Sequence, residues 1–333
     1  MTNDPQFFKP PEWGFHSGAQ MHWPSSTENR SDKFLKSLED TYSRIIEELH
    51  FFEVIHLFVQ DLNTRNRVMN KLSLKAVDID RVIIHQKSVI NIWARDLGPC
   101  FVKNNSGEKA VLNPIGSGHD DELPKYVSKL LYIKCIETPF ILKGNSTEMN
   151  GEGVLLTPDS ILKTNKLHLN LAKEDIEKKL IKYLGGEQII WLRSGLSVDK
   201  ANNYDQYLAR WLNSHTVLVN VTDDHEHPCY GILQENLEIL RSFKSERNTQ
   251  LKIETLSLPK SVSGEGGKHI HQGYSGFYIA NGAVLVPQFN VENDVEALRL
   301  FREFFPGRTI IPIDSTALAY EQGSIHGVIN SWY

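Results

Sequence analysis

The feature that most constrains the fold of this chain is a repeated order of local structure. A strand or hairpin is followed by a polar loop, an amphipathic helix and a further strand, and this order recurs five times in repeats of roughly 60 residues. Five such repeats indicate a closed, pseudo-symmetric α/β assembly in which each repeat buries its apolar face on its neighbours. An open α/β sheet alternates strands and helices in the same way, so the pattern alone leaves both architectures open.

The clearest single element is a helix expected at 32–49, where apolar residues recur on one face at helical spacing. Further helices are expected near 123–131 and at 173–184, 231–243 and 294–304. The expected strands or hairpins are 20–23, 54–59, 88–103, 133–136, 153–161, 188–192, 206–221, 251–256, 276–289 and 309–313, and a short strand at 324–329 closes the chain. The polar stretch 260–267 is typical of a loop. We therefore expect a single α/β domain spanning residues 1–333.

Composition narrows the class of protein. Of the 333 residues, 40% are hydrophobic and 23% are charged, which is ordinary for a globular protein, and the formal net charge is -5. The chain has no excess of basic residues that would favour a nucleic-acid or membrane partner. No apolar run is long enough to cross a bilayer. The N-terminal residues lack the charged head and apolar stretch of a signal peptide. We expect a cytoplasmic protein whose 3 cysteines are reduced.

A charged pair, Arg95-Asp96, lies between the apolar stretches 89–90 and 101–102 in the sequence Trp-Ala-Arg-Asp. Such groups are rarely buried unless they are paired or used in function. A buried Arg–carboxylate pair at a strand end explains the pattern without any function, and on the residues alone we favour it slightly over a ligand site.

Other polar stretches are less specific. Residues 203–205 (Asn-Tyr-Asp) and 151–153 (Gly-Glu-Gly) are typical of turns, and Asp159 suits the start of a helix. Residues 225–229 (His-Glu-His-Pro-Cys) resemble a metal-binding tract, but no partner set lies at zinc-site spacing, which favours a solvated loop. None of the cysteines lies in a recognisable nucleophile motif.

Several stretches resemble one family along most of the chain, the agmatine deiminases and Porphyromonas-type peptidylarginine deiminases. These are penteins, which have a five-bladed α/β-propeller fold, so the resemblance favours the closed assembly over the open sheet. The matching stretches are 11–24, 93–99 (WARDLGP), 151–157 (GEGVLLT), 190–196 (IWLRSGL), 222–224 (TDD), 277–289 (FYIANGAVLVPQF) and 323–326 (GSIH).

The resemblance also implies a chemistry. In this family a cysteine thiolate attacks the guanidinium carbon, a histidine serves as general acid and base, and two or three carboxylates bind the guanidinium nitrogens. It implies a small guanidinium or amine ligand, and we expect no metal and no cofactor.

The family's site residues are only partly retained. Its guanidinium carboxylates fall on Asp96, on Asp159, which is one methylene shorter than the family's residue, and on Asp205. The histidine of its G-H-V-D motif has become Asn203, and the nucleophilic cysteine of its I-H-C motif has become Gly327. An amide cannot exchange protons near neutral pH, and glycine offers no nucleophile.

Further expectations come from the same motifs. Trp23, Trp93 and Arg95 lie in matching blocks and are grouped with the substrate-binding residues, as are Asn203 and Gly327. The family's segment G-x-I-H-V-D falls on 145–150, which reads NSTEMN, so its His and Asp are also absent.

Three functional hypotheses follow. The chain binds a small guanidinium or amine ligand without hydrolysing it, or it is an enzyme of altered chemistry, or it is a protein-interaction module that keeps the propeller as a scaffold. The second hypothesis needs a relocated thiol at Cys100, or a water activated by Asp159 and Asp205. Burial in a strand is the plainer explanation of Cys100. Assembly into a homo-oligomer is left open.

Overall fold

The computed structural model describes residues 6–25, 30–89, 91–115, 122–194, 208–245, 250–259 and 273–333. The chain divides into two compact units, each made of separate stretches. The first unit holds residues 1–14, 96–257 and 333, and the second holds residues 15–95 and 258–332. The single domain expected for residues 1–333 stays a prediction.

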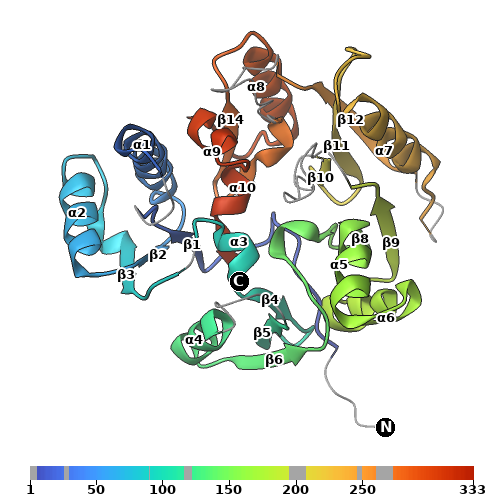
Figure 1. The fold of residues 1–333 in the computed structure, drawn as a ribbon, viewed down its shortest axis with the longest axis horizontal. Coiled ribbons are helices and arrows are strands. Elements are labelled where there is room, and N and C mark those ends of the chain that lie inside the picture. The colour runs from blue at the N-terminus through green and yellow to red at the C-terminus, as the bar shows by residue number, and fades with distance from the viewer. Residues whose placement is uncertain are drawn as a thin grey trace. The chain divides into compact units, whose positions relative to one another are not determined.

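The first unit holds three three-stranded sheets (Figure 1). Their strands are β4 (Cys100–Lys103), β5 (Lys109–Pro114) and β6 (Lys134–Thr138), then β7 (Glu148–Met149), β8 (Val154–Pro158) and β9 (Gln188–Leu192), then β10 (Ala209–Trp211), β11 (Thr216–Val221) and β12 (Lys252–Ser257). The helices are α3 (Ala94–Leu97, at the boundary), α4 (Glu122–Leu131), α5 (Ser160–Leu169), α6 (Lys173–Leu184) and α7 (Tyr230–Ser242), with a 3-10 turn η2 (Gly144–Ser146).

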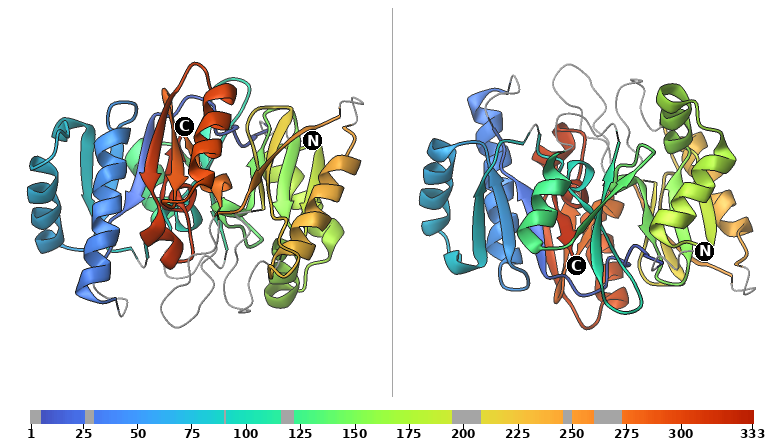
Figure 2. Two further views of the ribbon diagram at one scale, coloured as in Figure 1. Left: turned by 90° about the horizontal axis from the view of Figure 1, so that it is seen from above. Right: turned by 90° about the horizontal axis from the view of Figure 1, so that it is seen from below.

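The second unit holds two sheets. One contains β16 (Asn330–Trp332), β1 (Gly18–His22), β2 (Ile55–Val59) and β3 (Val82–Gln86), and the other contains β13 (Tyr278–Ile279), β14 (Ala283–Gln288) and β15 (Thr309–Asp314). Its helices are α1 (Asp32–Leu49), α2 (Leu62–Ser73), α8 (Asn293–Phe304), α9 (Thr316–Tyr320) and α10 (Ile325–Val328), with 3-10 turns η1 (Ile79–Arg81) and η5 (Tyr274–Gly276). Helix α2 runs alongside β3 (Figure 2).

All five sheets share one pairing pattern. A central strand pairs antiparallel with the strand before it and parallel with the strand after it, as β5 does with β4 and β6 and β14 does with β13 and β15. In the sheet of β1 the antiparallel partner is instead β16, from the other end of the chain, with Gly18 opposite Trp332. The five predicted repeats are therefore confirmed, and the first is completed by the C-terminal strand.

Helix α1 shows why these sequences fold locally as they do. The Ser31 side chain caps its first turn by accepting a hydrogen bond from the N–H of Phe34. Its apolar face, from Leu38 through Tyr42 to Leu49, is buried in the main apolar cluster of the second unit. The predicted bounds of α1, α6 and β9 are those of the structure.

Two of the expected strands are wrong in part. Residues 94–97, within the expected strand or hairpin at 88–103, form helix α3, and only 100–103 are a strand. The closing strand expected at 324–329 is helix α10, and the strand follows it at 330–332. The sequence pattern also missed α2, α5, β3 and β5. The expected loop at 260–267 lies outside the described residues.

Candidate functional site

Arg95 holds the segment that carries Gly327 through hydrogen bonds to its backbone. This arginine is 7% exposed, and its Nε donates to the carbonyl oxygen of His326 at 2.8 Å and to that of Ile329 at 3.0 Å. These two bonds tie the backbone of α10 and of the residue after it to the Arg95 side chain. Arg95 therefore fixes the backbone on both sides of Gly327.

Trp93 contacts the same segment at Gly323. A Cβ atom added to Gly323 would lie 1.9 Å from the Trp93 ring, so only glycine permits this approach. The next residue, Ser324, also lies close to a glycine, Gly276, where an added Cβ would be 2.4 Å from the Ser324 Cβ. The WARD and GSIH blocks are thus packed directly on each other.

A buried polar network lies beside this segment. The hydroxyl of Tyr278 donates to Glu53 at 2.9 Å and accepts from Ser331 at 3.2 Å, while Nδ1 of His16 lies 2.8 Å from the other oxygen of Glu53. The Arg95 guanidinium carbon lies 5.8 Å from the centre of the Tyr278 ring. This network explains the FYIANG block as a support for the C-terminal segment.

His22 links the sheet to the loop before α3. Its Nδ1 lies 3.0 Å from the carbonyl oxygen of Asn91, so Nδ1 carries the proton and Nε2 accepts from the Gln20 amide at 2.7 Å. The oxygen of that amide then accepts from the Trp332 indole at 2.9 Å. Burial lowers the pKa of His22 to about 4, which keeps the ring neutral.

Asp96 is the candidate carboxylate held by η2. Its Oδ1 accepts the backbone N–H of Asn145 at 3.0 Å. The early N–H groups of a helical turn lack backbone partners, so they are natural donors to a carboxylate. This contact fixes the Asp96 side chain in the first unit.

Asp159 is held by a different set of partners. It lies at the N-cap of α5 as expected, but its side chain makes no cap hydrogen bond. Its Oδ1 instead accepts from the N–H of Ser194 at 2.9 Å and from the Ser194 hydroxyl, and the Lys163 ammonium lies 3.2 Å away. Arg193 lies 3.8 Å from Oδ2.

These contacts set the charge state of Asp159. Burial alone would raise the pKa of Asp159, but the hydrogen bonds from Ser194 and the charge of Lys163 outweigh it, so the pKa is lower than usual. The carboxylate is ionised and already paired with protein cations. Sequence reasoning missed Ser194, Lys163 and Arg193, since nothing local couples them to Asp159.

The remaining expected site residues are placed as follows. Trp23 is 4% exposed, donates to Glu39 at 3.2 Å and packs edge-on against Tyr42, so its surroundings are those of a core residue. Gly327 is buried in α10 of the second unit. Asn203 and Asp205 lie outside the described residues, and a cavity shared by the family positions stays a prediction.

The three cysteines differ in their surroundings. Cys100 is 8% exposed on β4 and belongs to an apolar cluster. Burial raises the pKa of the Cys229 thiol to about 11, and burial also raises the pKa of Cys135. Thiols whose pKa is raised in this way hold their protons at neutral pH and are poor nucleophiles.

The tract at 225–229 is a turn before α7. The ring Nδ1 of His227 accepts the N–H of Cys229 at 3.1 Å, so one ring nitrogen is engaged locally. Within the described ranges, no three His, Cys, Asp or Glu side chains are grouped as a metal site would require.

Glu148 and Asn150 occupy the two positions where the family pattern has His and Asp. Glu148 accepts from the buried Arg210, whose other end lies 2.5 Å from Glu12. Asn150 accepts the N–H groups of residues 152 and 154 at 2.8 and 2.9 Å and donates to the carbonyl of Ser214 at 2.8 Å. Both side chains are used in holding the fold.

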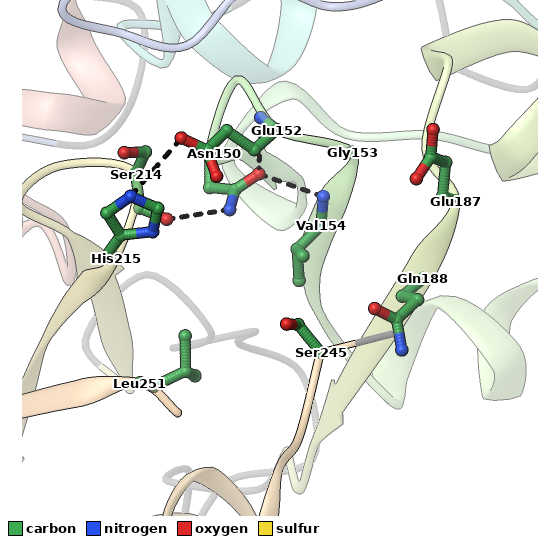
Figure 3. Close-up of a pocket in the computed structure, with 10 residues that line it drawn as sticks. All are labelled: Asn150, Glu152, Gly153, Val154, Glu187, Gln188, Ser214, His215, Ser245 and Leu251. Atoms are coloured by element: carbon green, nitrogen blue, oxygen red, sulfur yellow. Dashed lines mark hydrogen bonds and ion pairs between the residues drawn. The ribbon is translucent and has the colours of Figure 1, made fainter. Parts of the chain in front are cut away.

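A surface pocket lies at the N-terminal ends of strands β8 and β9, away from Asp159 (Figure 3). It opens beside Val154 and Gln188, where β8 and β9 begin, whereas Asp159 and Ser194 follow the ends of the same strands. The pocket contains none of the expected site residues. Its lining is Asn150, Glu152, Gly153, Val154, Glu187, Gln188, Ser214, His215, Ser245 and Leu251.

The repeated sheets and the retained motifs define an α/β protein of the pentein class, a five-bladed pseudo-symmetric α/β-propeller. Comparison with solved structures agrees. The agmatine deiminase of Enterococcus faecalis superposes with a TM-score of 0.89 at 24% identity, covering 100% of this chain and 98% of that one. An arginine deiminase structure from Porphyromonas gingivalis, titled "putative", gives a TM-score of 0.87 at 25% identity, with 98% of each chain covered.

The particular family follows from the sequence comparisons. The model of the Porphyromonas-type peptidyl-arginine deiminase family matches residues 8–331. A protein of Legionella pneumophila strain Paris, described as "Putative agmatine deiminase", is 31% identical over 331 residues, which is 96% of this chain and 93% of that protein. This chain therefore belongs to the Porphyromonas-type peptidyl-arginine deiminase family. Of the helices in the described ranges, none is long and apolar enough to cross a membrane.

Proposed function

We propose that this protein binds a small guanidinium or amine cation and does not hydrolyse it. The proposal rests on the segment at residues 323–329, where the family's nucleophile is missing but the surrounding contacts remain. Gly327 stands where the family has its nucleophilic cysteine, yet Arg95 and Trp93 still hold that segment as a fixed structure. A preserved frame without the attacking group favours binding without turnover.

The surroundings of the other thiols argue against a relocated nucleophile. Cys100 lies in an apolar cluster, and the raised pKa values of Cys135 and Cys229 disfavour thiolates. A water activated by Asp159 is disfavoured for a related reason. The lowered pKa of Asp159 makes this carboxylate a weak base.

Asp96 is the best-supported ligand carboxylate. It is half-buried, its position is fixed by the N–H of Asn145, and no ion pair joins it to a cation among the described residues. A carboxylate fixed in this way offers its remaining lone pairs to the N–H groups of a guanidinium or ammonium ion.

The proposal is tested by thermal-shift titration with agmatine, arginine, peptidyl-arginine and putrescine. A ligand that binds only the folded state raises the Tm, and the shift grows with concentration. We expect such a shift with at least one of these cations, and we expect Asp96→Asn, which keeps the shape and removes the charge, to abolish it. Ammonia release above background by the purified protein would overturn the absence of hydrolysis, and no shift with any of the four would favour the interaction scaffold.

A further inference from the structure

We propose that Asn145 is a specificity-determining residue that accepts a hydrogen bond from the same cation that Asp96 binds. The inference rests on the proposed function and adds the class of ligand. The ligand carries at least two N–H donors, as a guanidinium or a primary ammonium does, and charge alone is not sufficient.

The first observation is an unsatisfied acceptor. The Oδ1 atom of Asn145 is buried, and no donor among the described residues bonds to it. Buried polar side-chain atoms nearly always have a partner, and leaving one without a partner costs stability. Other buried side-chain atoms of the described residues, such as Thr138 Oγ1 and Trp211 Nε1, also lack a partner, but Asn145 Oδ1 lies beside a carboxylate assigned to the ligand. We therefore assign its donor to the ligand.

The second observation is the position of this acceptor. The backbone N–H of Asn145 is bonded to Asp96 Oδ1 at 3.0 Å. Covalent geometry keeps the Asn145 Oδ1 close to its own backbone nitrogen, so the two acceptor oxygens lie within about 7 Å of each other. One guanidinium, which presents N–H groups on several sides, can reach both.

The third observation is that the turn bearing Asn145 is fixed. The Lys9 ammonium donates to the carbonyl of Thr147 at 2.5 Å and to its hydroxyl at 3.0 Å. The Thr157 hydroxyl donates to the carbonyl of Ser146 at 2.7 Å. These bonds fix the backbone on the C-terminal side of Asn145, so its Cα and its N–H keep their place beside Asp96 and the acceptor needs little reordering when a ligand binds.

The sequence points the same way. In the family pattern G-x-I-H-V-D, the position that Asn145 occupies is glycine. This chain has therefore placed an amide beside the retained carboxylate, while its nucleophile and proton carrier are replaced by Gly327 and Asn203. The amide supplies an acceptor beside Asp96 that a glycine at this position would lack.

The test uses calorimetric titration of the full-length protein with n-butylguanidine and n-butyltrimethylammonium, which share a charge but differ in N–H donors. We expect the unmodified protein to prefer n-butylguanidine. Asn145→Ala should weaken n-butylguanidine binding about tenfold, since a hydrogen bond from a charged donor is lost, and leave n-butyltrimethylammonium unchanged. Asn145→Asp, which keeps an oxygen there and adds charge, should bind n-butylguanidine at least as tightly as the unmodified protein.

A stability measurement separates this role from a structural one. If Oδ1 serves only the ligand, Asn145→Ala should not lower the Tm of the free protein, because it removes an unsatisfied buried group. Asn105→Ala, at an exposed position of the same unit, is the control for both measurements. A lower Tm for free Asn145→Ala, or unchanged n-butylguanidine affinity, would overturn the inference alone. Failure of the unmodified protein to bind either compound or any of agmatine, arginine, peptidyl-arginine and putrescine would overturn the proposed function as well.

Discussion

The Nε atom of Arg95 lies 2.8 Å from the carbonyl oxygen of His326, the residue directly before Gly327. The WARD block therefore acts on the closing segment through the backbone, independently of which side chain stands at position 327. This independence explains how the segment keeps its fixed geometry after losing the family's cysteine.

We expect Arg95→Lys to destabilise the protein by about 2–3 kcal/mol, because hydrogen bonds from a buried charged group are lost and a lysine cannot reproduce the guanidinium geometry. Urea unfolding monitored by circular dichroism measures the loss. Arg241→Lys, at a side chain that is 57% exposed, should change the free energy of unfolding by less than about 0.5 kcal/mol. Equal losses of unfolding free energy for the two substitutions would contradict the role of Arg95 in holding the backbone beside Gly327.

The buried histidine His22 makes stability depend on pH. Its pKa is lowered from 6.5 to about 4 by burial, so between these values the unfolded chain binds a proton that the folded chain does not. Stability should therefore fall as the pH drops from about 6.5 to about 4, by roughly 3 kcal/mol for this residue. His56, whose pKa is also lowered to about 4 by burial and by the charge of His85, adds to the fall.

Free energies of unfolding measured from pH 7.5 to pH 4.5 test this. His22→Gln should flatten the pH dependence only in part, by roughly a third to a half, because His56 and His85, whose pKa values are also lowered by burial, still titrate. His168→Gln, an exposed position on α5, should leave the slope unchanged. A slope that does not differ between His22→Gln and the unmodified protein would show that His22 is not the group responsible.

Asp159 and Lys163 give a prediction about ligand binding. The ammonium lies 3.2 Å from the carboxylate and helps to lower its pKa, so it competes with any cationic ligand for that charge. If Asp159 contacts the ligand, Lys163→Met should raise agmatine affinity about threefold, the size expected for an exposed ion pair. Lys166→Met, exposed on the same helix, is the matched control. No difference between the two variants would remove Asp159 from the ligand site.

The sequence predicted those parts of the fold that depend on strong local patterns. Helix α1 has a continuous apolar face and was located correctly. Helix α2 buries only Thr64, Val68 and Leu72, and so weak a pattern was overlooked. The β-branched residues at 325, 328 and 329 favour a strand, but 325–328 form a helical turn, and the carbonyl groups at 326 and 329 accept from Arg95, a tertiary contact that local propensity does not report.

The site was less accessible to prediction because its contacts join distant residues. The motif match located Asp96 and Asp159, but not the bond between Asp159 and Ser194, 35 positions apart in the sequence. The role of Asn145 was likewise hidden, since one unsatisfied oxygen is a property of packing and not of local pattern. Motif identity therefore indicates where a family's site lies, and only the contacts indicate what each side chain is free to do.

The last prediction concerns hydrolysis. The purified protein should release no ammonia from agmatine or arginine above background, because a guanidinium is a poor electrophile and needs both an attacking thiolate and an acid to protonate the leaving group. Carboxylates that stabilise the cationic ground state give no acceleration by themselves. Gly327→Cys alone and Asn203→His alone should remain inactive, since nucleophile and acid act as a unit.

The double change Gly327→Cys with Asn203→His should give trace deiminase activity if the binding geometry has survived. Adding Asp96→Asn to this double variant should abolish the activity, and Cys100→Ala should leave it unchanged, because Cys100 lies in an apolar cluster of the first unit. Turnover by the unmodified protein that Cys100→Ala abolishes would show instead that the nucleophile has moved. The preserved contact between Arg95 and the backbone at 326 is the physical reason to expect recovery, because it already holds position 327 where a cysteine would be introduced.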